Sequence, residues 1–292
     1  MASAPSPRRL KPQQGRDLDL VLDVARILHA NGERSERTCA TADELARLWG
    51  LDVRIALSWD GVLAYDTREP AMRQTAWMPA RPVRVNMARV TAVMQACELT
   101  LAGRLGTREL AAAVADADRR SAAGTGRFVV ACASGAVALA VIFGAHRWQA
   151  LMLIAASAAL AGFVRRRLGR HAVGLFGQDF AAALIAGVIG ACAVRWEVSS
   201  SLRLVALCPC MILVPGPHIL NGCLDLLSRR ITLGVARLGF ALVTLGCIAA
   251  GVLAGLAAGG SSLPPVEPGM SPGSVMLASH TSRRPPGLRR RG

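Results

Sequence analysis

The chain has 292 residues, of which 52% are hydrophobic and only 18% are charged, and its mean hydropathy is positive. This composition favours a membrane protein over a soluble one. The formal net charge of +15 would suit a nucleic-acid-binding protein, but only 4% of the residues are aromatic and no basic stripe with interleaved aromatics is present. Nucleic-acid binding is therefore not expected.

Polar and apolar residues are segregated along the chain. Residues 1–16 are polar and contain several prolines, so we expect a disordered leader. Residues 17–126 are mixed and charged and predict a folded domain, whereas residues 127–260 are almost continuously apolar and predict a membrane domain. Residues 261–292 are rich in proline and arginine and are expected to form a disordered tail. Because the N-terminus lacks the apolar core of a signal peptide, we expect the first domain to stay in the cytoplasm.

The domain over residues 17–126 is predicted to be a compact α/β unit with the element order α-α-β-β-β-α-α. Asn31-Gly32 is a natural stop for the first helix, and Asp60-Gly61 is a hairpin signal between two strands. Thr41, Asn86 and Thr107 are candidate N-caps. The helices are expected at residues 18–30, 41–49, 86–101 and 107–117, and the strands at 53–59, 62–65 and 73–78.

The apolar part of the chain predicts five transmembrane helices, because a span needs about 20 mostly apolar residues. Basic residues concentrate in the loop Arg165–Arg170 and at Arg229-Arg230, which places both on the cytoplasmic side together with the N-terminal domain. The expected fold class is therefore an α-helical polytopic membrane protein preceded by a small cytoplasmic α/β domain. The spans are expected at about 127–145, 149–164, 173–194, 202–227 and 232–259.

The fourth expected span is interrupted by Pro215, Gly216 and Pro217. Proline removes a backbone donor and clashes with the preceding turn, so the helix must bend or stop there. Broken backbone at membrane depth is tolerated only where protein buries it or where it lines a cavity. After the break, polar residues at positions 218, 221 and 225 are spaced three and four apart, which places them on one helix face. Such a face often marks a substrate or proton path.

Each polar residue near the break has a functional and a structural interpretation. Asp225 either takes a proton or a substrate ammonium group, or forms an interfacial ion pair with Arg229. Asn221 either hydrogen-bonds a substrate or caps the broken backbone, and His218 either titrates in the path or bonds a freed carbonyl. Arg237 either pairs with Asp225, binds a substrate carboxylate, or extends toward the interface.

Other polar and sulfur-containing groups predict no further chemistry. Asp23, His29, Glu33 and Asp43 suggest a hydrolase, but no nucleophile elbow, metal pair or phosphate loop accompanies them, so we expect a solvated polar face and no enzyme activity. The eight cysteines lack zinc-like spacing and mostly lie in apolar segments, so no metal, cofactor or disulfide framework is expected. Glycines spaced by four in the fifth span favour a close helix–helix contact, at Gly251, Gly255 and Gly259.

Several motifs occur in the order found in a known family. They are Leu213-Val214-Pro215-Gly216-Pro217, Asn221, Asp225-Leu226 and Gly234-Val235-Ala236-Arg237-Leu238, with weaker matches at Leu22–Leu28, Asn31-Gly32, Asn86–Val90 and Ala102–Leu105. Over residues 17–259 the chain resembles the threonine/serine exporter family. His218 departs from the pattern, because it stands where many members are expected to have an apolar residue.

The resemblance implies an exporter of threonine, serine or a similar small polar metabolite in the bacterial inner membrane, with a cytoplasmic N-terminal domain. Longer members resemble a fusion with a second membrane unit, so the resemblance also implies a separate small membrane subunit or a homo-oligomer. Export is expected to be proton-driven, since no nucleotide-binding loop is present. The alternative is a membrane-anchored regulatory or scaffold protein whose cytoplasmic domain binds a ligand or a partner.

Overall fold

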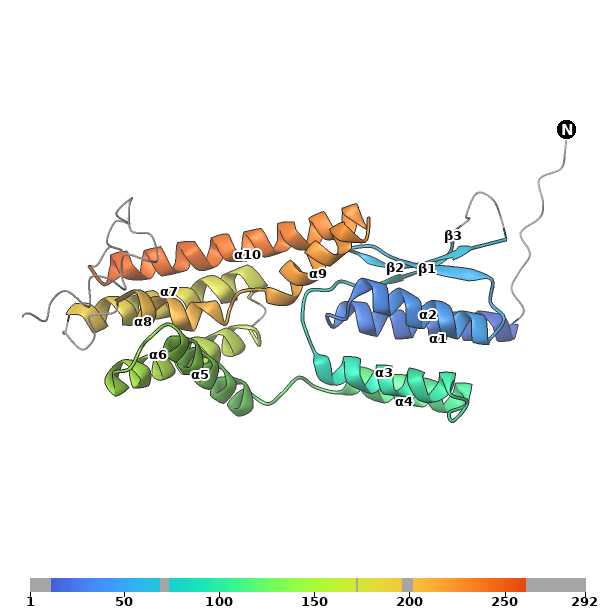
Figure 1. The fold of residues 1–292 in the computed structure, drawn as a ribbon, viewed down its shortest axis with the longest axis horizontal. Helices are drawn as coiled ribbons and strands as arrows, with labels where there is room; N and C mark the ends of the chain where they lie inside the picture. The colour runs from blue at the N-terminus through green and yellow to red at the C-terminus, as the bar shows by residue number, and fades with distance from the viewer. Residues whose placement is uncertain (1–11, 69–73, 172, 196–201, 261–292) are drawn as a thin grey trace, which may run out of the picture.

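The structure, a computed structural model, describes residues 12–68, 74–171, 173–195 and 202–260. Figure 1 shows two parts placed end to end, an N-terminal region (residues 12–119) and a helical bundle (residues 125–260). The expected disorder of residues 1–11 and of the tail 261–292, and the first residue of the expected third strand, lie outside the described residues.

The N-terminal region has the predicted order of four helices and three strands. The sheet is antiparallel with the order β1-β2-β3, and Ile55 of β1 faces Ala64 of β2, which in turn faces Ala76 of β3. The elements are α1 (Pro12–Ala30), α2 (Ser35–Leu48), β1 (Val53–Leu57), β2 (Gly61–Asp66), β3 (Gln74–Pro79), α3 (Met87–Leu101) and α4 (Thr107–Arg119).

Helix α1 is the centre of this region's core. Its apolar residues recur at the spacing of one helix face, and packing that face against the other elements removes it from water. Five of these residues are at most 3% exposed, namely Leu18, Val21, Leu22, Ala25 and Leu28. The predicted stop at Asn31-Gly32 is confirmed, since α1 ends at Ala30. Gly32 has a backbone φ of 97°, which residues other than glycine rarely adopt.

Helix boundaries differ from the sequence predictions in three places. Helix α1 begins at Pro12, so the expectation of disorder is wrong for residues 12–16. Helix α2 begins at Ser35 and not at Thr41, whose side chain is buried and lies near Met94 of α3, so Thr41 does not cap the helix. The N-cap residue of α4 is Gly106 and not Thr107, and the Gly106 N–H donates a hydrogen bond of 2.8 Å to the Glu109 carboxylate.

The bundle contains four helices that are long and apolar enough to cross a membrane. They are α5 (Thr125–Ile142), α6 (Trp148–Leu168), α7 (Leu175–Arg195) and α10 (Ile231–Ala258). The count rises to five if α8 (Leu202–Met211) and α9 (Gly216–Leu227) form one span bent by 57°. The predicted break is confirmed, because Pro215 is the N-cap residue of α9, and Gly216 and Pro217 open the new helix.

The outer surface of the bundle is apolar, as expected of a surface that meets lipid. Several large hydrophobic side chains on α5, α6 and α10 are at least 65% exposed, among them Val130, Ile142, Met152 and Leu242. Together with the length of the helices, this surface identifies a multi-pass membrane protein.

Helices α7 and α10 are in close contact through the predicted glycine ladder. A Cβ atom at Gly251 would lie 2.5 Å from the carbonyl oxygen of Phe180, and side chains at Gly255 and Gly259 would collide with Leu184 and Ala191. The helix–helix contact expected from the spacing is therefore confirmed.

A buried ion pair joins α6 to α7. Arg165 Nε lies 2.7 Å from Asp179 Oδ1, so Asp179 pairs with an arginine of the neighbouring helix.

Candidate functional site

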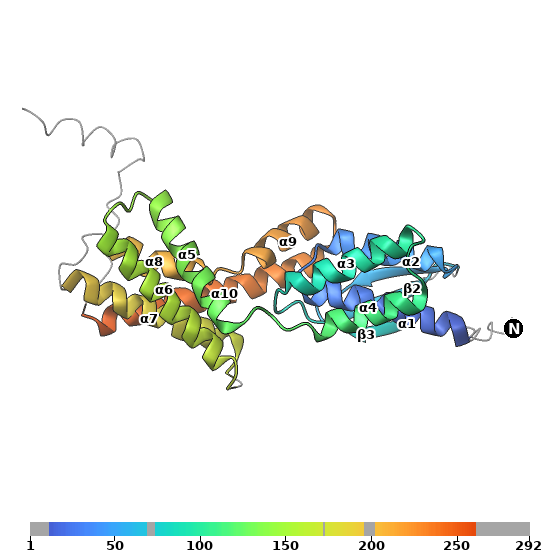
Figure 2. The same cartoon turned by 90° about the horizontal axis from the view of Figure 1, so that it is seen from below.

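Helix α9 presents its polar side chains to the protein and its apolar side chains outward. His218, Asn221 and Asp225 are 3–7% exposed, whereas Leu220 is 58% and Leu227 is 81% exposed. A helix at a water-facing surface has the opposite pattern, so this arrangement fits a helix whose outer face meets lipid. Figures 1 and 2 both place α9 between the N-terminal region and the rest of the bundle, beside the first half of α10.

The centre of the site is an ion pair between α9 and α10. Arg237 Nη1 lies 3.0 Å from Asp225 Oδ2, and the two side chains are only 2% and 4% exposed. Two glycines let the helices approach closely enough for this pair, since a Cβ atom at Gly222 would lie 2.9 Å from Leu238 Cγ, and one at Gly234 would lie 2.9 Å from the carbonyl oxygen of Gly222. The structure thus selects Arg237, and not Arg229, as the partner of Asp225.

Arg237 also contacts His29, a residue of α1 that is fully buried. Arg237 Nη2 lies 3.5 Å from His29 Nδ1, and His29 Nε2 lies 3.0 Å from the carbonyl oxygen of Ser58. Because a carbonyl accepts a hydrogen bond and cannot donate one, Nε2 carries the hydrogen and Nδ1 presents its lone pair to the guanidinium group. Burial and the nearby charge of Arg237 lower the pKa of His29 to about 3, which keeps the imidazole neutral.

Asn221 connects α9 to the turn that follows α1. Its Nδ2 donates a hydrogen bond of 3.2 Å to the carbonyl oxygen of Gly32. Asn221 therefore bonds the backbone of the N-terminal region and does not cap the broken backbone of its own helix.

A group of aromatic rings closes the other side of the site. Trp59, in the β1–β2 turn, lies 6.4 Å from the ring of His218 and 5.6 Å from the ring of Phe240, between ring centroids. His218 and Phe240 are themselves 4.7 Å apart, and Phe176 of α7 extends the group. His218 thus packs against rings, with no hydrogen bond to a freed carbonyl among those found in the described residues.

The four polar residues selected from the sequence, Asp225, Arg237, Asn221 and His218, therefore lie in one buried cluster that begins after the break at residues 215–217. Sequence reasoning did not include the residues that the N-terminal region contributes. His29 was expected on a solvated polar face, but it is 0% exposed, and Glu33 is 7% exposed. The signal was present, because His29 follows Leu22 and Ala25 at the spacing of the buried face of α1.

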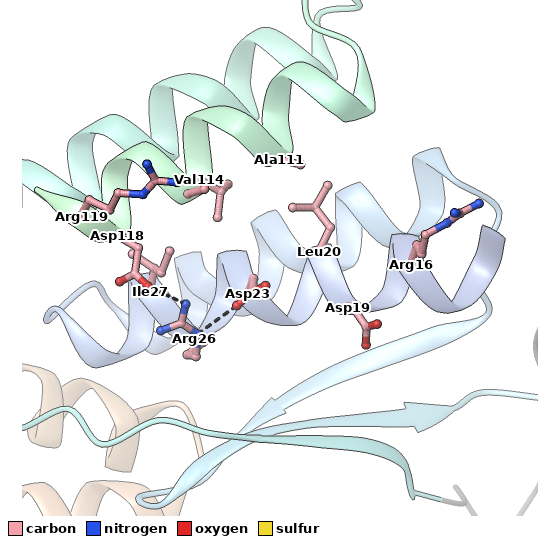
Figure 3. A pocket seen from close by; sticks show the side chains of 11 residues that line it. Arg16, Asp19, Leu20, Asp23, Arg26, Ile27, Ala111, Val114, Asp118 and Arg119 are labelled. Carbon is pink, nitrogen blue, oxygen red and sulfur yellow. Dashed lines mark hydrogen bonds and ion pairs between the residues drawn. The ribbon is translucent and has the colours of Figure 1, made fainter. Parts of the chain in front are cut away.

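A second hollow lies within the N-terminal region, away from this cluster. A pocket of about 500 Å³ lies between α1 and α4. Figure 3 shows aliphatic side chains from both helices and charged residues around them. Arg26 pairs there with Asp23 and Asp118, each at 3.0 Å. Among the residues that the structure describes, no group of three or more His, Cys, Asp or Glu side chains is arranged to hold a metal ion.

Comparison with known proteins gives one family match over most of the chain. Residues 19–259 match the family described as "Putative threonine/serine exporter" (ThrE). No curated protein and no solved structure matched the chain. The match includes both the N-terminal region and the bundle, and hence every residue of the buried cluster, and the family is one of transporters and not of enzymes. The chain therefore belongs to the threonine/serine exporter family.

Proposed function

We propose that the protein exports threonine, serine or a similar small polar metabolite across the bacterial cytoplasmic membrane as a proton-coupled secondary transporter. In this proposal residues 17–126, which include most of the N-terminal region, form a cytoplasmic domain, and residues 127–260 form the membrane domain. The observation that carries the proposal is the buried Asp225–Arg237 pair beside a broken helix, within a chain of this family.

The pair is complementary to a zwitterionic amino acid. A guanidinium group binds a carboxylate through two parallel hydrogen bonds, and a carboxylate binds an ammonium group. When an amino acid enters the site, its ammonium group takes the place of Arg237 beside Asp225, and its carboxylate takes the place of Asp225 beside Arg237. Neither buried charge is then left uncompensated. Asn221 and His218 lie on the same face of α9 and supply groups for a substrate hydroxyl.

Proton coupling is assigned to Asp225, because it is the one carboxylate among the four candidate residues. Protonation of Asp225 removes the charge that holds the substrate ammonium group, so the proton and the substrate compete for Asp225, which links proton uptake to substrate release. The sequence contains no phosphate-binding loop of the nucleotide-hydrolysing type, which favours a gradient as the energy source.

The orientation and the assembly are also part of the proposal. Arginine-rich segments at residues 165–170 and 229–230 favour a cytoplasmic N-terminal region. A second small membrane subunit, or further copies of this chain, would cover part of the exposed apolar surface of α5, of which only 17% of the residues are buried.

Efflux of labelled threonine and serine from preloaded cells that lack their own exporters tests the proposal. The chain is expressed alone and with a candidate small membrane partner. Efflux with the chain alone indicates a homo-oligomer, and efflux only with the partner indicates a two-component exporter. Efflux that persists at normal expression in Asp225→Ala and Asn221→Ala variants would overturn the site assignment.

The second candidate function, a membrane-anchored regulatory protein, is favoured by the cavity between α1 and α4. Its aliphatic floor and its mixed charges suit a small ligand bearing both signs of charge, with Arg16, Asp19 and Arg119 at the rim. Calorimetric titration of the purified full chain with amino acids distinguishes the two functions. Binding that is lost in Asp19→Asn, in a chain without efflux, would favour the regulatory function.

A further inference from the structure

The N-terminal region covers the candidate transport site, and it does so through the residues proposed to bind the substrate. Arg237 contacts His29, Asn221 contacts Gly32, and His218 packs near Trp59. The contacts join positions as far as 208 residues apart in the sequence. We propose that the N-terminal region is the gate on its side of the transport path, and that His29 is a positioning residue that holds the gate closed by fixing Arg237. This inference rests on the proposed function.

In the observed arrangement the described residues leave the site almost no access to solvent. Arg237 is 1% exposed, Asp225 is 3% exposed and Asn221 is 7% exposed. The guanidinium group of Arg237 is held at Nη1 by the Asp225 carboxylate and at Nη2 by the His29 lone pair. A substrate carboxylate can reach Arg237 only if the N-terminal region or α9 moves, so the structure corresponds to a closed state.

The N-terminal region is built to separate as a folded unit. Its hydrophobic core is formed only by residues of the N-terminal region, and the two clusters in the bundle contain only residues of the bundle. Among the described residues, none of these three clusters extends across the boundary. Separation therefore exposes a small set of polar and aromatic contacts and leaves the core of each part intact.

The connection between the two parts permits such a movement. Residues 120–124 link α4 to α5 without helix or strand, all of them are exposed, and their sequence is Arg-Ser-Ala-Ala-Gly. Fully extended, five residues reach about 17 Å. The link is long enough for the site to open and short enough to return the region to the same place.

The two ring nitrogens of His29 allow its role in the gate to be separated from its role in folding. In His29→Gln, the side-chain amide takes the place of Nε2 and donates to the Ser58 carbonyl, but no acceptor faces Arg237. In His29→Asn, the side-chain oxygen takes the place of Nδ1 and accepts from Arg237, while the bond to Ser58 is lost. A gate role predicts that the Asn variant resembles the wild type and the Gln variant opens, and a structural role predicts the reverse.

Two native cysteines report the state of the gate. Cys39 lies on α2 close to Arg230 and Asp225, at the boundary between the two parts, and is 7% exposed. Cys97 lies on α3 inside the core of the N-terminal region and is 0% exposed. Opening of the gate exposes Cys39 and leaves Cys97 protected, whereas unfolding exposes both.

The experiment is maleimide labelling of the full chain in membrane vesicles, with modified peptides quantified by mass spectrometry. Labelling of Cys39 is expected to rise about tenfold in His29→Gln, the effect of losing one hydrogen bond to a charged group, and to stay near the wild-type rate in His29→Asn. Equal Cys39 labelling in both variants and the wild type, or the reverse order, would overturn the role of His29. Labelling of Cys97 in a variant reveals that the variant unfolds, and the locking experiment below then tests whether the N-terminal region is the gate.

The locking experiment cross-links the native Cys39 to Arg230→Cys with a bis-maleimide, since Cys39 lies close to Arg230 across the boundary between the two parts. Cross-linking is expected to stop threonine efflux that the untreated Arg230→Cys variant supports. Efflux that continues after complete cross-linking would overturn the gate. A wild-type chain that supports no efflux under any condition would instead refute the proposed function, and the labelling of Cys39 would still test whether the two parts separate.

Discussion

Replacing Asp225 by asparagine keeps the shape of the side chain and removes its charge, which leaves the guanidinium group of Arg237 buried without a counter-ion. Arg237 Nη1 and Asp225 Oδ2 are 3.0 Å apart, and the side chains of Arg237 and Asp225 are 2% and 4% exposed. Breaking a buried ion pair in this way costs about 3–5 kcal/mol of folding free energy. We expect the Tm of the purified protein to fall by about 10 °C, and threonine efflux to be lost.

A double variant separates the loss of stability from the loss of transport. Asp225→Asn combined with Arg237→Met removes both charges, so most of the lost Tm is expected to return, because no uncompensated charge remains in the interior. Efflux is not expected to return, since neither the ammonium nor the carboxylate of a substrate then has a partner. Restored efflux in the stable double variant would refute the reasoning.

The matched control is a second buried carboxylate of the bundle that is paired with an arginine. Asp179 lies 2.7 Å from Arg165, whose side chain is 28% exposed. In Asp179→Asn the freed arginine charge can regain water, so we expect a smaller fall in Tm and retained efflux. If Asp179→Asn lost efflux to the same extent as Asp225→Asn, the loss of any buried carboxylate charge would stop transport, and the effect would not be specific to Asp225.

Three further predictions concern the packing of α10 against α7, the pH dependence of stability, and the hydrogen bond that joins α2 to β1. Gly255→Ala is expected to lower the Tm through a clash with α7 that costs about 1–3 kcal/mol, whereas Gly246→Ala, which meets no atom within 4 Å, is expected to be neutral. The pKa of His29, lowered to about 3, means that the unfolded chain binds a proton that the folded protein excludes. The contribution of neutral His29 to stability is therefore complete above about pH 6.5 and is lost as the pH falls toward 3. The loss is about 2 kcal/mol at pH 5, so the Tm measured from pH 7 to 5 should fall less steeply in His29→Gln than in the wild type. Asp43→Ala is expected to cost about 1–2 kcal/mol of unfolding free energy, because Asp43 Oδ1 accepts the Ile55 N–H at 2.8 Å and ties α2 to β1, and a chemical denaturation curve checks this.

The elements of the fold follow from local patterns that the sequence carries in full. The apolar stripe from Leu18 to Leu28 predicts α1, and the run of apolar residues after position 126 predicts the membrane helices. Pro215 and Pro217 predict the break before α9, because proline acts through its own ring on the adjacent backbone. The glycines spaced by four in α10 predict its close neighbour, although not that the neighbour is α7.

Boundaries were predicted less well, for a physical reason. Thr41 has the side chain of an N-cap, but α2 begins six residues earlier because Thr38 and Cys39 continue its buried face. Capping contributes about 1 kcal/mol, which burial of a helix face exceeds.

The sequence by itself determined that the chain enters a membrane, where the fourth apolar segment breaks, and that His218, Asn221 and Asp225 share one helix face. Only the tertiary structure decided that Arg237 is the partner of Asp225 and that His29 and Gly32 complete the cluster. Periodicity reports which face of a helix is buried, but it carries no information about what lies against that face. The contacts from Asn221 to Gly32 and from Arg237 to His29 join residues 189 and 208 positions apart, and they form only when the N-terminal region and the bundle meet.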